Sequence, residues 1–278
     1  MREAQPVKID AAPGSRPDQV CGTYKAWDMP LTGAIDRIWY SHSGTAGGAH
    51  QLLLPFAEPS LVLRRRMDAQ GRTESFDIAI SPACHDGGSY VAEANEELFA
   101  VRVAPERLER LLDLHPRDLA GERVPVPAAL RAKLDGVLVM AGRDSFREAW
   151  AQLARVLGSL EVARADASLD HASLAVRRAA GRLGPSRLAE LCDISPRQLR
   201  RGFAERYGLS PRALARRLRL TAALIEADGQ ARPRWAEIAT GHGYCDQAHL
   251  VRECRSIMGA TPVTLHACRR TMAVSFKN

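Results

Sequence analysis

The spacing of apolar residues divides the chain into a strand-rich first part and a helical second part. Between residues 24 and 103, short apolar stretches alternate with clusters of Gly, Pro, Asp and Asn. This is the pattern of many short strands, as in a sandwich or a small barrel. The predicted strands lie at 35–40, 51–54, 60–63, 76–80 and 98–103.

From residue 105 the apolar spacing becomes helical, and helices are predicted over 105–114, 128–141 and 144–160. In the last of these, apolar side chains recur at every third or fourth position, which indicates one apolar stripe along a helix. The stripe consists of Phe146, Trp150, Leu153, Leu157 and Leu160. Packing against the strand-rich part is the preferred interpretation, because two heptads are short for a coiled coil; a dimer seam is the alternative.

A length of 278 residues predicts two compact units. We expect a loose tail at 1–20, a mixed strand-and-helix domain at 21–160, a linker at 161–170 that includes the polar segment 161–168, and an all-helical domain at 171–278. We do not expect the polar start to act as a secretory signal, and no apolar run approaches the ~18 residues of a membrane span. The six cysteines form no C-x-x-C pair, so a cytoplasmic protein with free thiols is predicted.

Basic residues are concentrated in the second part of the chain. Residues 171–278 carry a formal charge of +11, whereas the residues before them carry −4. This asymmetry is expected of a phosphate-binding module joined to a neutral or acidic one.

The last hundred residues contain an internal repeat at an offset of 51 positions. Its aligned pairs are Leu199 and Leu250, Arg201 and Arg252, Phe203 and Cys254, Gly208 and Gly259, and Pro211 and Pro262. In each copy a glycine can close a helix in the left-handed conformation, and a Ser-Pro or Thr-Pro pair can begin the next helix. The sequence therefore predicts helix, sharp stop and new helix, twice.

Each copy also has a short apolar helix upstream, predicted at 186–192 and 235–240, followed by a tight turn. Short helix, turn and longer helix is the helix-turn-helix arrangement, in which the second helix enters the major groove of DNA. A helix predicted over 211–227 joins the copies and spans roughly 25 Å. Two recognition helices in successive major grooves lie about 34 Å apart.

Helical periodicity separates core residues from candidate DNA-contacting residues on the two recognition helices. Leu199, Phe203 and Tyr207 in the first, and Leu250, Cys254 and Ile257 in the second, are predicted to be buried. The candidate DNA-contacting residues are Ser195, Arg197, Gln198, Arg200 and Arg201 in the first copy, and Asp246, Gln247, Ala248, His249, Val251 and Arg252 in the second. Arg212, Arg216, Arg217 and Arg219 on the joining helix are candidate phosphate contacts, with solvated or buried side chains as the alternative.

Over residues 175–270 the chain resembles the arabinose-regulator (AraC/XylS) family of transcription regulators. The matching residues are Leu188-Ala189, 195–203, Gly208-Leu209-Ser210-Pro211, Ile238-Ala239, Gly243-Tyr244, Asp246-Gln247, His249-Leu250, Arg252, Gly259 and Thr261-Pro262. Leu250 and Cys254 stand where the family usually has phenylalanine, and both are still apolar.

The resemblance implies a one-component regulator that binds double-stranded DNA through two unequal recognition helices. It also implies an N-terminal sensing or dimerisation domain, often a cupin-like barrel. A strand-rich half with a turn such as Asp86-Gly87-Gly88 is similar to an uncharacterised sensor type of such regulators. An unidentified small-molecule effector, RNA polymerase and a second copy of the chain are candidate partners, and neither a cofactor nor an enzymatic activity is expected.

Several alternatives remain open. A thiol-responsive regulator would use Cys245, with His249 and Cys254 near it. A metal site would need clustered ligands, and the histidines of the first part form no H-x-H pair. A DNA-repair alkyl acceptor would use Cys84, which lacks the usual Pro-Cys-His-Arg surroundings. A nucleoid-type protein would bind DNA without sequence preference.

Overall fold

The computed structural model describes residues 23–28, 35–43, 50–91, 93–103, 114, 119, 123–126, 128–142, 146–159 and 167–271. Its strands are β1 (Thr23–Asp28), β2 (Ile35–His42), β3 (His50–Leu53), β4 (Ser60–Met67), β5 (Thr73–Ser81), β6 (Gly88–Val91), β7 (Glu96–Val103) and β8 (Val124–Pro125). Its helices are α2 (Ala128–Gly142), α3 (Phe146–Ser159), α4 (Ala167–Arg178), α5 (Pro185–Leu191), α6 (Pro196–Tyr207), α7 (Pro211–Asp228), α8 (Trp235–Gly241), α9 (Gln247–Met258) and α10 (Pro262–Thr271).

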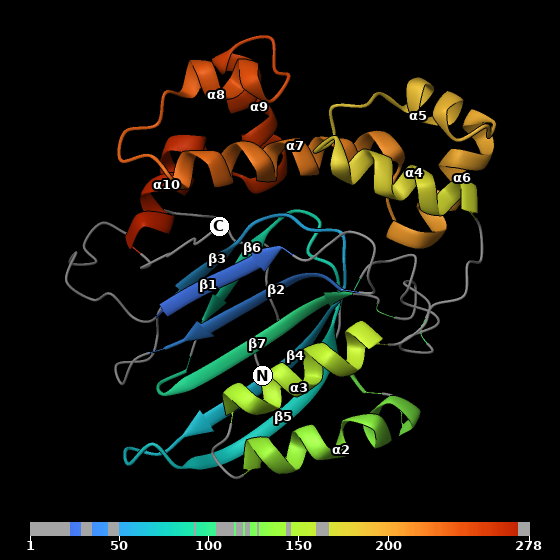
Figure 1. Ribbon diagram of the computed structural model, residues 1–278. Helices are drawn as coiled ribbons and strands as arrows, with labels where there is room; N and C mark the ends of the chain where they lie inside the picture. The colour runs from blue at the N-terminus through green and yellow to red at the C-terminus, as the bar shows by residue number, and fades with distance from the viewer. Residues whose placement is uncertain are drawn as a thin grey trace.

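The N-terminal part is built on a six-stranded sheet with the order β1-β2-β7-β4-β5-β8, and β3 and β6 form a second sheet of two strands (Figure 1). The paired strands are antiparallel throughout both sheets. Each predicted strand segment lies within or overlaps one of these strands. The strand-rich fold class predicted for this part is therefore confirmed.

Alternation along β4, β5 and β7 gives the large sheet an apolar face that α2 and α3 cover (Figure 1). Leu63, Ile80 and Val101 on this face are fully buried, together with Leu134 of α2 and Leu153 of α3. Burial of an apolar side chain of this size stabilises the fold by about 1.5–3 kcal/mol. This core holds the sheet and both helices together.

Leu153 belongs to the apolar stripe predicted over 144–160, and its burial in this core agrees with the preferred packing interpretation. The side chains of the other four stripe residues, residues 105–113 of the helix predicted over 105–114, and the tail at 1–20 lie outside the described residues. Helix α4 begins at Ala167, so its first turn lies inside the segment predicted as a linker. The predicted domain division stays a prediction.

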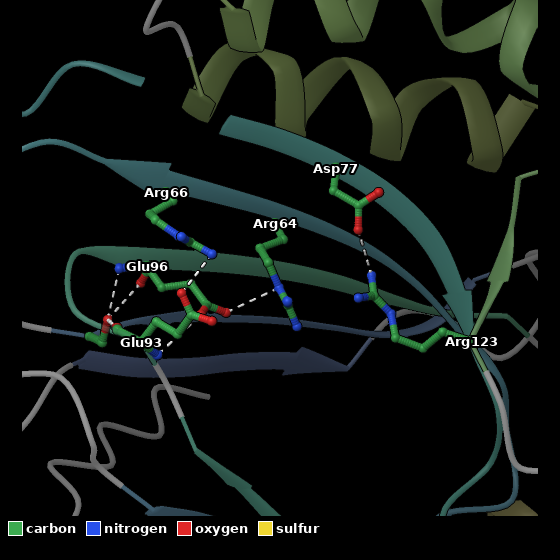
Figure 2. Close-up of polar contacts among 7 residues, drawn as sticks. Arg64, Arg66, Asp77, Glu93, Glu96 and Arg123 are labelled. Carbon is green, nitrogen blue, oxygen red and sulfur yellow. Dashed lines mark hydrogen bonds and ion pairs between the residues drawn. The ribbon is translucent and has the colours of Figure 1, made fainter. Parts of the chain in front are cut away.

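The opposite face of the large sheet carries charged pairs, which Figure 2 shows. Arg64 and Arg66 of β4 contact Glu96 and Glu93, with nitrogen–oxygen distances of 3.3 and 2.6 Å. Arg123 contacts Asp77 of β5 at 3.0 Å and so joins the segment before β8 to the sheet. These pairs connect β4 to β7 and to the segment before it, and β5 to the segment before β8.

The C-terminal part is entirely helical in the described residues 167–271, as predicted. It has two hydrophobic cores, one at each end of α7. Leu214 of α7 packs into the first core with α4, α5 and α6, and Leu220 and Leu224 pack into the second with α8, α9 and α10. The 18 residues of α7 make a rod of about 27 Å that joins the two units. No described helix is long and apolar enough to cross a bilayer.

Candidate DNA-binding surface

Two helix-turn-helix units occupy the two ends of α7. The first unit consists of α5 and α6, and the second consists of α8 and α9. The predicted recognition helices are α6 and α9, each of 12 residues. The predicted repeat is confirmed because each unit places a short helix, a turn and a longer helix in the same order.

Local hydrogen bonds fix the start of both recognition helices. The Ser195 hydroxyl accepts from Gln198 N at 3.2 Å, and the Gln198 amide oxygen accepts from Ser195 N at 2.9 Å, which completes a capping box. In the second unit an Asp246 carboxylate oxygen accepts from His249 N at 2.6 Å. Ser195 and Asp246 thus have structural roles at the helix starts, and contact of either with DNA stays a prediction.

The ends of α6 and α9 also match. Gly208 and Gly259 close them in the left-handed conformation, with φ of 62° and 73°. Side-chain oxygens of Ser210 and Thr261 then accept from backbone N–H groups three residues later, each at 3.2 Å, and begin α7 and α10. The predicted stop-and-restart at both glycines is confirmed.

Helix α6 buries one face and exposes the other. Leu199, Phe203 and Tyr207 are at most 2% exposed, as predicted. The predicted DNA-contacting side chains on the outer face are exposed: Arg197, Gln198, Arg200 and Arg201. Arg201 has only a marginal contact with Glu205, at 4.0 Å, and its side chain is 75% exposed. The outer face therefore presents three guanidinium groups to solvent.

Helix α9 follows the same plan with less charge. Leu250, Cys254 and Ile257 are buried, as predicted. On the opposite face Gln247, Ala248 and Arg252 are exposed and Val251 is half-buried. At the repeat offset of 51, Ala248, Val251 and Arg252 correspond to Arg197, Arg200 and Arg201 of α6. The two outer faces are thus equivalent in geometry and different in chemistry.

His249 differs from the other candidates because it contacts its own turn. Its Nδ1 accepts from Cys245 N at 3.5 Å, and its ring meets the Tyr244 ring edge to face at a centroid distance of 5.2 Å. The ring is half-buried. These contacts hold the turn of the second unit against α9, so the structure gives His249 a local packing role.

The arginines of α7 have mostly intramolecular partners. Arg216 contacts Glu253 of α9 at 2.7 Å, and the Arg219 guanidinium lies 5.4 Å from the centre of the Tyr244 ring. Arg217 contacts Asp86 of the N-terminal part at 2.6 Å. Of the four arginines considered as phosphate contacts, Arg212 is the exposed one. Arg216, Arg217 and Arg219 are half-buried, which agrees with the alternative interpretation that their side chains are partly buried.

Two cysteines considered as reactive groups are poorly suited to that role. Burial raises the pKa of the Cys254 thiol to about 12 and that of the Cys84 thiol to about 11. Because the thiolate is the reactive form, both thiols are protonated and unreactive near neutral pH. Cys245 is exposed. No group of three or more His, Cys, Asp or Glu residues suited to a metal ion occurs in the described parts of the chain.

One contact between the two parts was not predicted from the sequence. Residues 54–57 and 84–88 of the N-terminal part reach α6, α7 and α9. The turn Asp86-Gly87-Gly88 is a sequence signal in this region, but nothing in its pattern indicates which element it contacts.

Comparison with known proteins agrees with the two units in the structure. Residues 188–267 match a family model described as a helix-turn-helix domain. The chain matches no curated protein.

Similar solved structures include AraC-type proteins. A transcriptional regulator from Chromobacterium violaceum with an AraC-type DNA-binding domain is 23% identical over 37% of this chain and 91% of that chain, with a TM-score of 0.34. The C-terminal domain of AraT, a response regulator from Geobacillus stearothermophilus, is 24% identical over 41% and 92%, with a TM-score of 0.35. ToxT from Vibrio cholerae is 10% identical over 89% and 98%, with a TM-score of 0.42.

Proposed function

We propose that residues 188–267, which match a helix-turn-helix domain model, form the DNA-binding domain of an AraC-type transcription regulator, and that α6 and α9 enter two adjacent major grooves of one asymmetric DNA site. The observation that carries the proposal is the equivalence of the outer faces of the two helices. Arg197, Arg200 and Arg201 are exposed on one, while Ala248 and Arg252 are exposed at the matching positions of the other.

The chemistry of the two faces supports an asymmetric site. Arginine can donate two hydrogen bonds to O6 and N7 of guanine, so Arg201 and Arg252 are suited to guanines at matching positions of the two half-sites. Apolar side chains such as Ala248 and Val251 can contact the methyl group of thymine. We therefore propose a guanine-rich half-site for α6 and a half-site with thymine contacts for α9.

The structural frame supports simultaneous binding. Helix α7 gives a spacer of about 27 Å between the two units, and recognition helices in successive grooves are about 34 Å apart. The cap and core contacts that fix α6 and α9 leave their outer faces free of the protein's own cores. Ser195, Gln198, Asp246, Gln247 and His249 complete the proposed DNA-binding set.

We also propose that residues 21–160 form a sensing or dimerisation domain and that 171–278 form the DNA-binding domain. The separate sheet-and-helix core of the N-terminal part supports this division. An unidentified small-molecule effector, RNA polymerase and a second copy of the chain are the proposed partners, without a cofactor or an enzymatic activity. A thiol-responsive regulator using the exposed Cys245 is the second candidate.

The test is selection of a binding site from random DNA with the full chain, followed by titration of the selected site and of a scrambled sequence at one salt concentration. The expected motif has two unlike halves about one helical turn apart and binds at least ~10³-fold more tightly than scrambled DNA. Equal affinity for both sequences would contradict the proposal and favour nonspecific binding.

The second candidate is tested by repeating the DNA titration after treating the protein with a mild oxidant, and again after treating it with a reductant. Loss of specific binding on oxidation that is absent in Cys245→Ser would support a thiol-responsive regulator. Unchanged binding would rule it out.

A further inference from the structure

Two segments of the N-terminal part, residues 54–57 and 84–88, contact both helix-turn-helix units and α7; we call them the docking loops. They are joined to each other, because Phe56 N donates to Cys84 O at 2.8 Å. The Arg102 guanidinium of β7 lies 4.2 Å from the centre of the Phe56 ring. Since β7 is an inner strand of the large sheet, the docking loops are anchored to the body of the N-terminal part.

Both docking loops contact α7. Arg217 Nε donates to His85 O at 2.6 Å, and Arg217 Nη2 donates to Asp86 Oδ1 at 2.6 Å. One turn further along the helix, Thr221 Oγ1 donates to Pro55 O at 2.8 Å. Charge-assisted bonds such as those of Arg217 are stronger than neutral ones, so the loops hold a defined stretch of α7.

The loops also contact the end of α6. The His85 imidazole is hydrogen-bonded to the backbone oxygen of Tyr207, the last residue of α6. Next to it, a Cβ placed on Gly208 would lie 3.6 Å from His85. Ala57 of the other loop is buried in the core of the first unit.

The corresponding end of α9 is contacted in the same way. Gly87 lies so close to Met258, the last residue of α9, that a Cβ at Gly87 would overlap the Met258 sulfur. With a φ of 71°, Gly87 also has a backbone conformation that favours glycine. Leu54 is buried in the core of the second unit.

Tyr207 and Met258 are equivalent in the repeat, at the offset of 51. The docking loops therefore contact the same end of both recognition helices, while Arg201 and Arg252 remain exposed on their outer faces. Each unit has its own hydrophobic core, and both cores are built on α7. Bending or twisting of α7 would change the orientation of one recognition helix relative to the other, and the docking loops oppose that change.

We propose that the docking loops fix the relative orientation of α6 and α9, so that the N-terminal part determines which half-site spacing the protein binds. This inference rests on the proposed function, because it assumes that both helices bind one DNA site. Release of the loops would widen the range of spacings that the protein tolerates. An effector could act on DNA binding through this contact without covering either recognition helix.

The experiment compares full-length wild type with Asp86→Arg on the selected site and on the same site with one base pair inserted between its halves. The insertion moves the halves apart by roughly 3.4 Å and rotates them by about 35°. Asp86→Arg places a like charge beside Arg217, and because the Asp86 side chain is 72% exposed it leaves the cores unchanged. Gly87→Ala, whose Cβ would meet both the Met258 side chain and the Leu53 carbonyl oxygen, is the second variant. Glu74→Arg, an exposed charge reversal at the far end of β5, is the matched control.

Wild type and Glu74→Arg should lose at least about 30-fold in affinity on the inserted site, a loss within the range caused by one mismatched base pair. Asp86→Arg and Gly87→Ala should lose no more than about 5-fold on insertion, because their units can reorient. If both variants lost as much affinity on the inserted site as wild type does, the inference would be overturned while the proposed function stayed intact. Equal wild-type affinity for selected and scrambled DNA would overturn both.

Discussion

Substitution of Arg201 tests whether α6 recognises bases or only the DNA backbone. In the free protein the Arg201 side chain is 75% exposed, and its nearest carboxylate oxygen, from Glu205, is 4.0 Å away. An exposed pair at this distance contributes little, so Arg201→Ala should change the free energy of unfolding by less than about 0.5 kcal/mol. Any larger effect on DNA binding must then come from the protein–DNA contact.

The expected effect on binding follows from the geometry of arginine and guanine. Loss of a bidentate contact costs about 1–3 kcal/mol of discrimination against the wrong base. At 1.4 kcal/mol per factor of ten, this corresponds to a roughly 5- to 150-fold weaker affinity for the selected site. Affinity for scrambled DNA should fall much less, because that complex contains no bidentate base contact.

The assay is titration of wild type and Arg201→Ala with fluorescently labelled selected and scrambled DNA at several salt concentrations. Arg155→Ala, which removes an exposed positive charge from α3 in the N-terminal part, controls for net charge. Equal losses of affinity for both DNA sequences, with the slope of log affinity against log salt concentration reduced by about one, would indicate that Arg201 contacts a phosphate and would refute base recognition. Unchanged affinity for both sequences would remove Arg201 from the interface.

Three further predictions concern the folded protein. Arg269→Ala should lower the free energy of unfolding by about 3–5 kcal/mol in urea denaturation, because it leaves the buried Asp228 carboxylate without its bidentate partner; a loss below about 1 kcal/mol would be typical of an exposed pair instead. Gly259→Ala should cost about 1–2 kcal/mol in the same assay, since its φ is 73°, and an unchanged stability would contradict the left-handed cap. Burial lowers the pKa of His85, so the folded state favours the neutral imidazole and the free energy of unfolding should decline as the pH falls below about 6.5. In thermal unfolding, His85→Gln should show a smaller decline than wild type. Identical pH profiles for the two proteins would contradict this prediction.

The proposed function and the docking loops suggest that different parts of the chain contact DNA and orient the recognition helices. In the proposed function, the outer faces of α6 and α9 supply the chemical groups that meet DNA. The C-terminal ends of the same helices contact the N-terminal part. A change in the N-terminal part can therefore alter the arrangement of the two faces. This does not require any residue of the N-terminal part to touch DNA.

The C-terminal helices could be predicted because their boundaries are encoded within a few residues. Ser195 and Gln198 form a capping box three positions apart, and Gly208 takes the left-handed conformation required at a helix end. The burial of Leu199 and Phe203 follows from helical periodicity alone. Such local signals, present twice at an offset of 51, indicated both the fold of this part and the candidate DNA-contacting faces.

Five strands of the N-terminal part, β2, β3, β4, β5 and β7, were predicted in place, whereas β1, β6 and β8 were missed and the arrangement of the strands was not predicted. Short apolar runs bounded by turn residues locate β4 and β7, yet β7 lies between β2 and β4 in the sheet. This order depends on pairing between strands that are distant in the sequence, such as Leu63 with Phe99. No local pattern specifies that register.

The sequence by itself determined the two helix-turn-helix units, their exposed arginines and their unequal chemistry, because caps, glycine conformations and periodicity act over a few residues. Only the tertiary structure decided the roles of the arginines on α7. Arg217 contacts Asp86, which lies 131 positions earlier in the chain, whereas Arg212 remains exposed. Both belong to the same helix and carry the same charge, so the difference arises from where the fold of the N-terminal part brings its docking loops.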